Sequence, residues 1–143
     1  MIRKITESDK SEYIEMVTKF YNSDAVLKPV PSENFEATFL ELMRSDDYTE
    51  AFIIEFEGQT AGYALLAKTF SQEAGGVCIW IEELFIKPKF RGKGLGKQFF
   101  EFLFQNRPAK RYRLEIEPEN ETAVALYLKK GFSFFEYGQM IKE

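Results

Sequence analysis

The order of apolar and polar positions predicts helices and strands that follow one another along the chain. Residues 2–6 alternate like a short strand. Apolar residues then recur with helical spacing up to residue 21, and again over residues 35–43. Ser8 or Asp9 can cap the first helix and Ser32 the second, because such side chains accept hydrogen bonds from free N–H groups.

The rest of the chain continues this alternation. Residues 51–70 have the pattern of two strands around a Glu57-Gly58 turn. Residues 75–88 form a third, long strand, and its largely apolar composition is typical of a central position. The remaining predictions are a helix over 95–106, a strand over 111–118, a helix over 119–132 with Asn120 near its start and Gly131 as its stop, and strand character from 132 to 143.

This order predicts an α+β or mixed α/β fold with an antiparallel first half. A helix connects the long strand to the strand at 111–118, which makes that pair parallel. The chain has 143 residues, of which 45% are apolar, and this suits one packed domain over residues 1–143.

Charge and rare residues exclude several classes of function. A net charge of −4 argues against nucleic-acid binding. The chain has no histidine, which excludes a Ser-His-Asp triad and a histidine metal site. The single cysteine, Cys78, lies in an apolar run and is expected to be a buried structural thiol. With no signal-peptide core and no apolar run near ~18 residues, a cytoplasmic protein without metal or membrane contact is expected.

A glycine-rich stretch joins the long strand to the following helix. Glycines at alternate positions before a helix can aim several N–H groups at one phosphate, and the helix N-terminus adds positive potential. The stretch is not a Walker A loop, because Gln98 follows Gly96-Lys97. It is not a Rossmann fingerprint, because Lys97 stands at the third glycine position. A flexible solvated turn is the alternative.

Two motifs around this stretch resemble those of the GNAT N-acetyltransferase superfamily. The first, "EELFIKPKFRGKGLGKQFFEFL", is similar to the acetyl-coenzyme A signature [Q/R]-x-x-G-x-[G/A] through Arg91, Gly94 and Gly96. The second, "NETAVALYLKKGF", is similar to the pattern N-x-x-A-x-x-L-Y-x-x-x-G-F, which begins at Asn120 and includes Tyr127. The glutamate pair in "WIEELFI" resembles the diamine acetyltransferase subgroup, which however has Glu-Asp.

The resemblance implies a fold and an acetyl donor. The fold would be a mixed, mostly antiparallel sheet of six to seven strands with about four helices and a parallel pair splayed at the cofactor site. Acetyl-coenzyme A would be the donor, bound by the backbone of the strand and the loop, by charged side chains of the loop and by the second motif. The implied cofactor-binding residues are Leu84, Phe85, Ile86, Arg91, Gly92, Lys93, Gly94, Leu95, Gly96, Lys97, Asn120 and Tyr127.

Each of these residues also has a plainer interpretation. Lys93 and Lys97 can be solvated charges, Asn120 a helix cap, and Tyr127 a core tyrosine. By resemblance, Tyr127 is the acid that protonates the leaving sulfur. Two adjacent glutamates in an apolar strand are unusual, because neighbours point to opposite faces unless a bulge intervenes. Resemblance favours Glu82 as the base, with Glu83 as the alternative and a salt-bridge pair or solvated glutamates as the plain interpretation.

The expected function is transfer of acetyl to a primary amine of a small molecule, with polyamine-like and aminoglycoside-like compounds as the candidate acceptors. By resemblance, residues 21–50 and 69–76 select the acceptor, and their acids include Asp24, Glu33, Glu36, Asp46 and Asp47. Solvated acids explain the same composition. A peptide amine acceptor, a non-catalytic coenzyme A-binding module and an unrelated phosphate-binding domain are the alternatives. Homodimers are common in the family, so the resemblance allows a homodimer.

Overall fold

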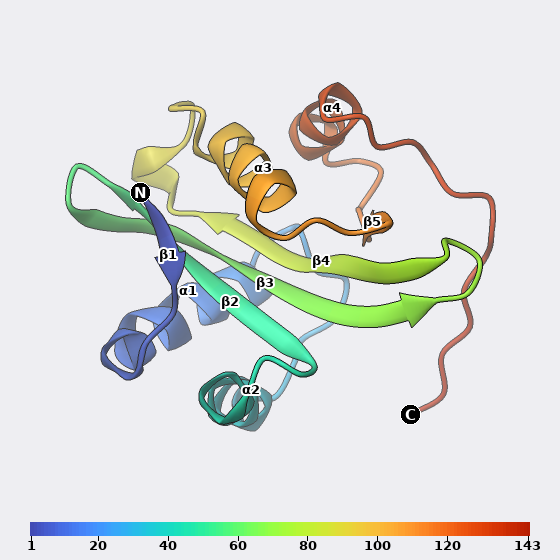
Figure 1. Cartoon of the computed structure of the whole chain (residues 1–143). Coiled ribbons are helices and arrows are strands. Elements are labelled where there is room, and N and C mark those ends of the chain that lie inside the picture. Colours follow the sequence, from blue (N-terminus) through green and yellow to red (C-terminus); the bar gives the residue numbers. More distant parts are fainter.

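The computed structural model describes all 143 residues. Its centre is a five-stranded sheet in the order β1-β2-β3-β4-β5. Helices α1 and α2 cover one face of the sheet, and α3 and α4 cover the other (Figure 1). In chain order the elements are β1 (Ile2–Lys4), a 3₁₀ turn (Glu7–Asp9), α1 (Lys10–Tyr21), α2 (Ser32–Arg44), β2 (Thr49–Phe56), β3 (Gln59–Ser71), β4 (Gly76–Ile86), a second 3₁₀ turn (Pro88–Phe90), α3 (Leu95–Asn106), β5 (Arg111–Leu114) and α4 (Glu121–Lys129).

The sheet is mixed, as the order of elements predicts. Strands β1 to β4 pair antiparallel with their neighbours, and β5 pairs parallel with β4. Helix α3 provides the crossover that a parallel pair requires. The mostly antiparallel sheet and its parallel pair are therefore confirmed.

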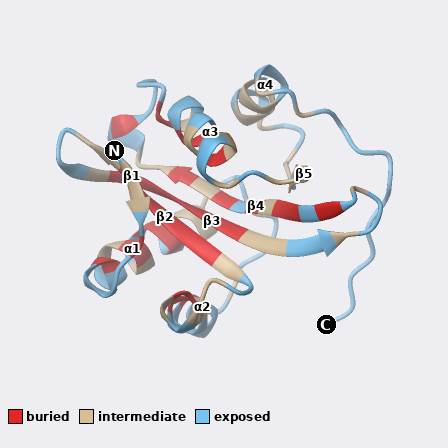
Figure 2. Cartoon of the chain, in the orientation of Figure 1, coloured by how far each residue is buried: buried red, intermediate tan, exposed pale blue.

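Burial on both faces explains the apolar runs of the central strands. Figure 2 shows buried residues concentrated in β2, β3 and β4 and on the helix surfaces that face them. One layer of the core lies under α1 and α2 and includes Tyr13, Phe39, Tyr63 and Phe85. The other lies under α3 and includes a fully buried pair, Phe99 and Phe100. Burying an aromatic or aliphatic side chain of this size contributes roughly 1.5–3 kcal/mol.

The predicted strand at the C-terminus is wrong, and so is the predicted count of six to seven strands. Residues 133–143 form no helix or strand, and their backbone groups make no backbone hydrogen bonds. The segment runs past the end of the sheet in Figure 1 without joining β5. Its one clear anchor is Phe135, whose ring lies under the guanidinium groups of Arg111 and Arg113. A segment with the sequence pattern of a strand forms a strand only where it can pair with the edge of a sheet.

The expected helix caps also differ from the structure. Ser32 is the first residue of α2, and the residue before the helix is Pro31, so Ser32 does not cap it. Asp9 precedes α1, but its carboxylate accepts hydrogen bonds from the N–H and hydroxyl of Thr6 and from Arg3. Asp9 therefore fixes the segment before the helix instead of the free N–H groups at its start.

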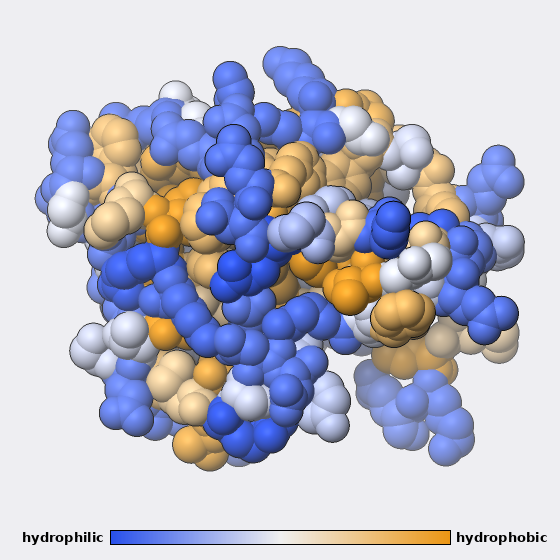
Figure 3. Space-filling model, in the orientation of Figure 1, coloured by the Kyte–Doolittle hydropathy of each residue, from blue (hydrophilic) through white to orange (hydrophobic).

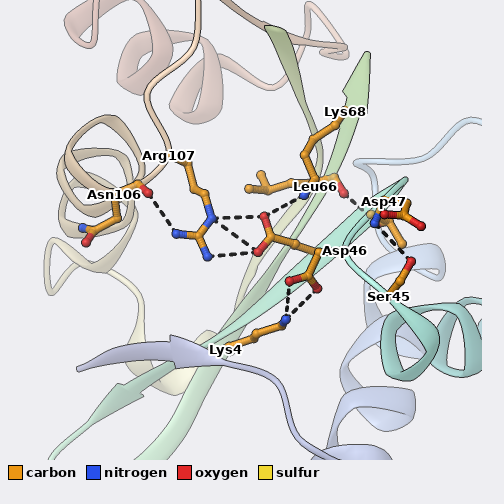
Figure 4. Close-up of polar contacts among 10 residues, drawn as sticks. Lys4, Ser45, Asp46, Asp47, Leu66, Lys68, Asn106 and Arg107 are labelled. Atoms are coloured by element: carbon orange, nitrogen blue, oxygen red, sulfur yellow. Dashed lines mark hydrogen bonds and ion pairs between the residues drawn. The ribbon is translucent and has the colours of Figure 1, made fainter. Parts of the chain in front are cut away.

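A buried ion cluster joins the start of β2 to the end of α3. Glu50 is 3% exposed, and its carboxylate accepts hydrogen bonds from Arg107 and Lys68 (Figure 4). Burial alone would raise the pKa of Glu50, but these two cations outweigh it and hold that pKa below its ordinary value. Close by, Lys4 pairs with Asp46 at the surface (Figure 4).

Hydrophilic residues form most of the face seen in Figure 3, and hydrophobic residues show between them in separate areas. Exposed ion pairs of the chain include Lys10 with Glu36 and Arg44 with Glu41. No helix combines the length and the apolar character that crossing a bilayer requires.

Replacing Arg107 by Met is expected to destabilise the fold by about 3 kcal/mol, because it removes the main partner of a buried carboxylate. Arg44→Met, which breaks an exposed pair, should cost far less, because solvent screens pairs at the surface. Urea unfolding measures both. Because the pKa of Glu50 is lowered in the fold, the Arg107 contribution is present above the ordinary value of 4.5 and shrinks as pH falls below it. Equal losses in the two variants would contradict this assignment.

Candidate active site

A bulge in β4 places the two adjacent glutamates. In the pairing of β3 with β4, Leu65 lies opposite Glu83 and Leu66 lies opposite Ile81, so Glu82 is the extra residue. Below the bulge, Ile79 and Ile81 belong to the core under α3; above it, Glu83 points to the side of α1 and α2. The bulge that the glutamate pair suggested is therefore present.

Glu83 is buried between two tyrosine hydroxyls. Glu83 is only 5% exposed. Its carboxylate accepts hydrogen bonds from Tyr63 Oη at 2.6 Å and from Tyr21 Oη at 3.0 Å. Burial raises the pKa of Glu83, the two tyrosine hydroxyls oppose that rise, and the charge of Glu82 adds to it. The plain interpretation of Glu83 as half of a salt-bridge pair does not hold, since no lysine or arginine contacts it.

Glu82 is more exposed than Glu83 and stands beside a third carboxylate. Burial raises the pKa of Glu82, and the negative charge of Glu115, just beyond β5, raises it further. A carboxyl whose pKa is raised toward neutrality is a better proton acceptor for a reacting amine than an ordinary surface glutamate. Both glutamates of the pair have raised pKa values, and both line the same cavity.

This cavity has a volume of about 600 Å³ and lies between α1, α2 and the sheet. No lysine or arginine lines it. Its lining residues are Tyr13, Val17, Tyr21, Val30, Asn34, Phe35, Ala37, Thr38, Glu41, Thr49, Leu65, Ala67, Glu82 and Glu83.

The expected acceptor region supplies most of this lining, but not through the acids that the sequence singled out. Residues between 21 and 49 contribute Tyr21 and Thr49 among others, whereas residues 69–76 contribute none. Glu36 and Asp46 form ion pairs with lysines away from the cavity, and Asp47 pairs with Arg44. For these three acids the interpretation as solvated surface charge is correct.

Strands β4 and β5 separate next to the bulge. They pair only from Cys78 to Ile81 and from Arg111 to Leu114. Beyond that point β4 continues to Ile86 without β5. The backbone of Leu84, Phe85 and Ile86 therefore has β3 on one side and no strand on the other. The splayed parallel pair is confirmed, and its free edge can accept an extended ligand as an added strand.

The glycine loop follows directly after this free edge. Gly92 and Gly94 both have φ of +75°, a conformation that other residues adopt at a cost, and Gly94 immediately precedes α3. The N–H of Arg91 donates to the carbonyl of Pro88. Each N–H group from Gly92 to Lys97 donates no hydrogen bond within the chain. Six consecutive free donors at a helix N-terminus form an anion site.

The charged side chains of the loop have different settings. Arg91 Nε donates to the carbonyl of Ile86, which ties the loop to the end of β4. Lys93 lies over the ring of Phe56, and Lys97 lies 3.9 Å from Glu101 at the exposed surface. None of these three is buried, so each remains accessible to a phosphate.

The second motif forms α4 on the other side of the split. Asn120 caps this helix, since its Oδ1 accepts a hydrogen bond from the N–H of Ala123 at 3.3 Å. The ring of Tyr127 packs against Phe100 and Phe132, and its hydroxyl makes no hydrogen bond within the chain. Burial raises the pKa of Tyr127, so the phenol stays protonated. Tyr127 and Glu115 line a second cavity of about 800 Å³.

The structure thus brings together some of the predicted residues and separates others. Glu82 and Glu83 share one cavity, while Tyr127 lies in another, on the α3 and α4 side of the sheet. Glu115 belongs to the lining of the second cavity and influences Glu82 in the first, which indicates that the two sides approach each other at the split of β4 and β5.

Sequence reasoning missed three residues of this site. Tyr21 and Tyr63 hold Glu83, and Glu115 acts on Glu82. Tyr21 was assigned to a helix face and to the start of the acceptor region over residues 21–50, but not to a contact with Glu83, and Tyr63 was assigned to an apolar strand. The one signal that pointed to Glu115 was its place after the parallel strand, where the alternation of "RLEIEP" turns acidic.

The chain as a whole matches known proteins in sequence and in fold. Residues 12–132 match the model of the acetyltransferase (GNAT) family. The chain belongs to the GNAT family. Members of this family are acyltransferases that use acetyl-coenzyme A as the acetyl donor, and membership places the chain among them.

Individual GNAT relatives agree with this assignment. A spermine/spermidine N(1)-acetyltransferase of Bacillus subtilis (strain 168) is 30% identical over 101 residues, which cover 66% of this chain and 66% of that protein. A possible acetyltransferase from Clostridium difficile 630 has the same fold, with a TM-score of 0.83, 16% identity and coverage of 100% and 96% of the two chains. An aminoglycoside N-acetyltransferase in complex with coenzyme A has a TM-score of 0.78 and 17% identity, with coverage of 100% of this chain and 93% of that chain.

The loop and strand edge of this GNAT chain fit acetyl-coenzyme A. The pyrophosphate needs N–H donors and the extended pantetheine arm needs a free strand edge, and the six free N–H groups and the unpaired part of β4 provide both. A side chain at Gly96 would meet Leu126 at 3.1 Å, so this glycine keeps α3 and α4 close. Nowhere in the chain do three His, Cys, Asp or Glu side chains gather as metal ligands.

Gly94→Val is expected to weaken coenzyme A binding at least 10-fold, because valine disfavours positive φ and would turn the free N–H groups away from one another. Isothermal titration with coenzyme A measures the dissociation constant. Gly58→Val is the matched control: Gly58 has φ of +73° and open space around it, as Gly94 has, but lies in the β2–β3 turn. Equal weakening in both variants would show that strain in the fold, and not the loop, is responsible.

Proposed function

We propose that this GNAT chain transfers the acetyl group of acetyl-coenzyme A directly to a primary amine of a small cationic molecule. The observation that carries the proposal is the placement of Glu82 and Glu83 at a bulge, in a cavity without basic residues, beside the free edge of β4. A cavity lined by carboxylates and tyrosines suits a cationic acceptor. Names of related proteins agree, since one relative is a spermine/spermidine acetyltransferase and a similar fold belongs to an aminoglycoside acetyltransferase.

The proposed reaction needs one proton acceptor and one proton donor. The amine must be neutral to attack, although a free alkylamine has a pKa of about 10.4. Glu82 takes a proton from the amine, directly or through water, as the nitrogen bonds to the carbonyl carbon of the acetyl group. The C–S bond breaks, its electron pair goes to sulfur, and Tyr127 gives that sulfur a proton. Solvent then restores both residues, and the products are an amide and free coenzyme A.

Positioning supplies much of the rate in this scheme. Holding an amine and a thioester in contact can contribute roughly 7–11 kcal/mol to a bimolecular reaction. No nucleophilic residue is required: Cys78 is buried and pairs within the sheet at a distance from the bulge. A binding module without catalysis would need neither the raised pKa of Glu82 nor a protonated, unpartnered Tyr127.

One sheet joins both layers of the core, which supports a single domain over residues 1–143. The cytoplasmic location and the homodimer rest on sequence and resemblance.

Tyr127→Phe is expected to lower kcat by roughly 10- to 10⁴-fold, because it removes the proton donor for the leaving sulfur. The dissociation constant of coenzyme A should stay nearly unchanged. Release of coenzyme A thiol with a panel of primary amines measures kcat, and Tyr48→Phe, at an exposed tyrosine that lines neither cavity, is the control. An unchanged kcat would show that Tyr127 is not the acid. If none of the amines causes release of coenzyme A from the wild type, although the cofactor binds, the chain is a binding module without catalysis.

Glu115→Gln should move the acidic limb of the pH–rate profile to lower pH. A base must be ionised to act, and the negative charge of Glu115 raises the pKa of Glu82, so removing that charge lowers the pKa. The profile of kcat/KM against pH shows the shift. Glu119→Gln, an exposed glutamate on the same connection, should leave the limb in place. If the limb stays in place in both variants, Glu82 is not the group that titrates.

A further inference from the structure

Three carboxylates are buried in this protein, and one of them has no cation. Asp9 lies against Arg3, with two N–O distances of 2.8 Å, and Glu50 lies against Arg107 and Lys68. Glu83, at 5% exposure, has only the hydroxyls of Tyr21 and Tyr63. A buried carboxylate without a positive partner is costly, and natural proteins nearly always provide one.

A positive partner for Glu83 would have to come from a ligand, because the cavity lining holds none. Glu83 lines the cavity between α1, α2 and the sheet, and no lysine or arginine lines it. Glu41, on the same wall, already has Arg44 as its partner at the outer surface. Each oxygen of Glu83 accepts one tyrosine hydrogen bond, which leaves each oxygen able to accept another. Tyr21 also lines the cavity, and its oxygen can accept as well as donate.

The two glutamates are suited to different tasks. Two hydrogen bonds to Glu83 stabilise its ionised form and make it a weaker proton acceptor than its burial alone would produce. Glu82 has no such donors and lies nearer to the split of β4 and β5, with Glu115 beside it. The position of Glu82 next to the split suits a base, and the two hydroxyls around Glu83 suit a counter-ion for a bound cation.

We propose that Glu83, together with the Tyr21 hydroxyl, binds a second ammonium group of the acceptor, one that is not acetylated. This inference rests on the proposed function and adds that the acceptor carries at least two amines. The reacting amine is neutral at Glu82, and the other stays positively charged at Glu83. The glutamates are adjacent in the chain and line the same cavity, so a short spacer between the two amines suffices.

The test compares two acceptors of equal chain length, butylamine and diaminobutane, by release of coenzyme A thiol. Wild type should prefer the diamine in kcat/KM by about 10- to 100-fold, the usual range for a hydrogen bond to a charged group. Glu83→Gln should remove most of that preference, and Tyr21→Phe should reduce it by about 2- to 10-fold. Glu57→Gln and Tyr48→Phe, both exposed, are the matched controls and should retain the preference.

The outcomes separate this inference from the proposed function. Coenzyme A release at equal efficiency with both amines in wild type would overturn the inference and leave the function standing. Equal loss of kcat with both amines in Glu83→Gln would also overturn it and make Glu83 the base. If wild type turns over neither amine, or if Glu83→Gln does not fold, calorimetry of wild type and Tyr21→Phe with coenzyme A present decides. If wild type binds the diamine more tightly than butylamine, and Tyr21→Phe weakens the binding of the diamine, the site is supported. Equal binding of both amines by wild type overturns it.

Discussion

The bulge at Glu82 is the constraint on which the site depends. A regular strand has a strict two-residue period, so in a strand of this sequence without a bulge Glu83 would lie on the same face as Ile79 and Ile81, in the core under α3. With the bulge, that face keeps its apolar residues and Glu83 turns to the tyrosines beneath α1 and α2. A single inserted residue thus permits two carboxylates in an otherwise apolar central strand.

The bulge also coincides with the end of the parallel pairing. Strand β5 pairs with β4 up to Ile81 and no further, and the bulge begins at the next residue. A local increase of twist is the usual effect of a bulge, and it favours separation of neighbouring strands. A free backbone edge and a pair of carboxylates that line a cavity therefore occur at the same irregularity of one strand, as the proposed donor and acceptor sites require.

Much of the fold followed from the sequence because local signals and tertiary packing agree in it. The runs in β2 and β3 are apolar since both faces are covered, and the glycines before α3 mark a turn that needs positive φ. The C-terminal segment shows the opposite case. Its aromatic residues suggest a strand, but pairing depends on an edge far away in sequence. The segment makes no backbone hydrogen bonds, and its contacts with β5 include those of Phe135 with two arginines.

The sequence could predict only those parts of the site whose residues are close to one another in the chain. The glutamate pair and the glycine loop are local patterns, whereas the contacts of Glu83 join residues separated by 62 and 20 positions. Which glutamate is the better base depends on these distant tyrosines and on Glu115, because hydrogen-bond donors stabilise an ionised carboxylate and a neighbouring negative charge opposes ionisation. Two adjacent and chemically identical side chains thus have different surroundings, because their partners lie far from them in the sequence.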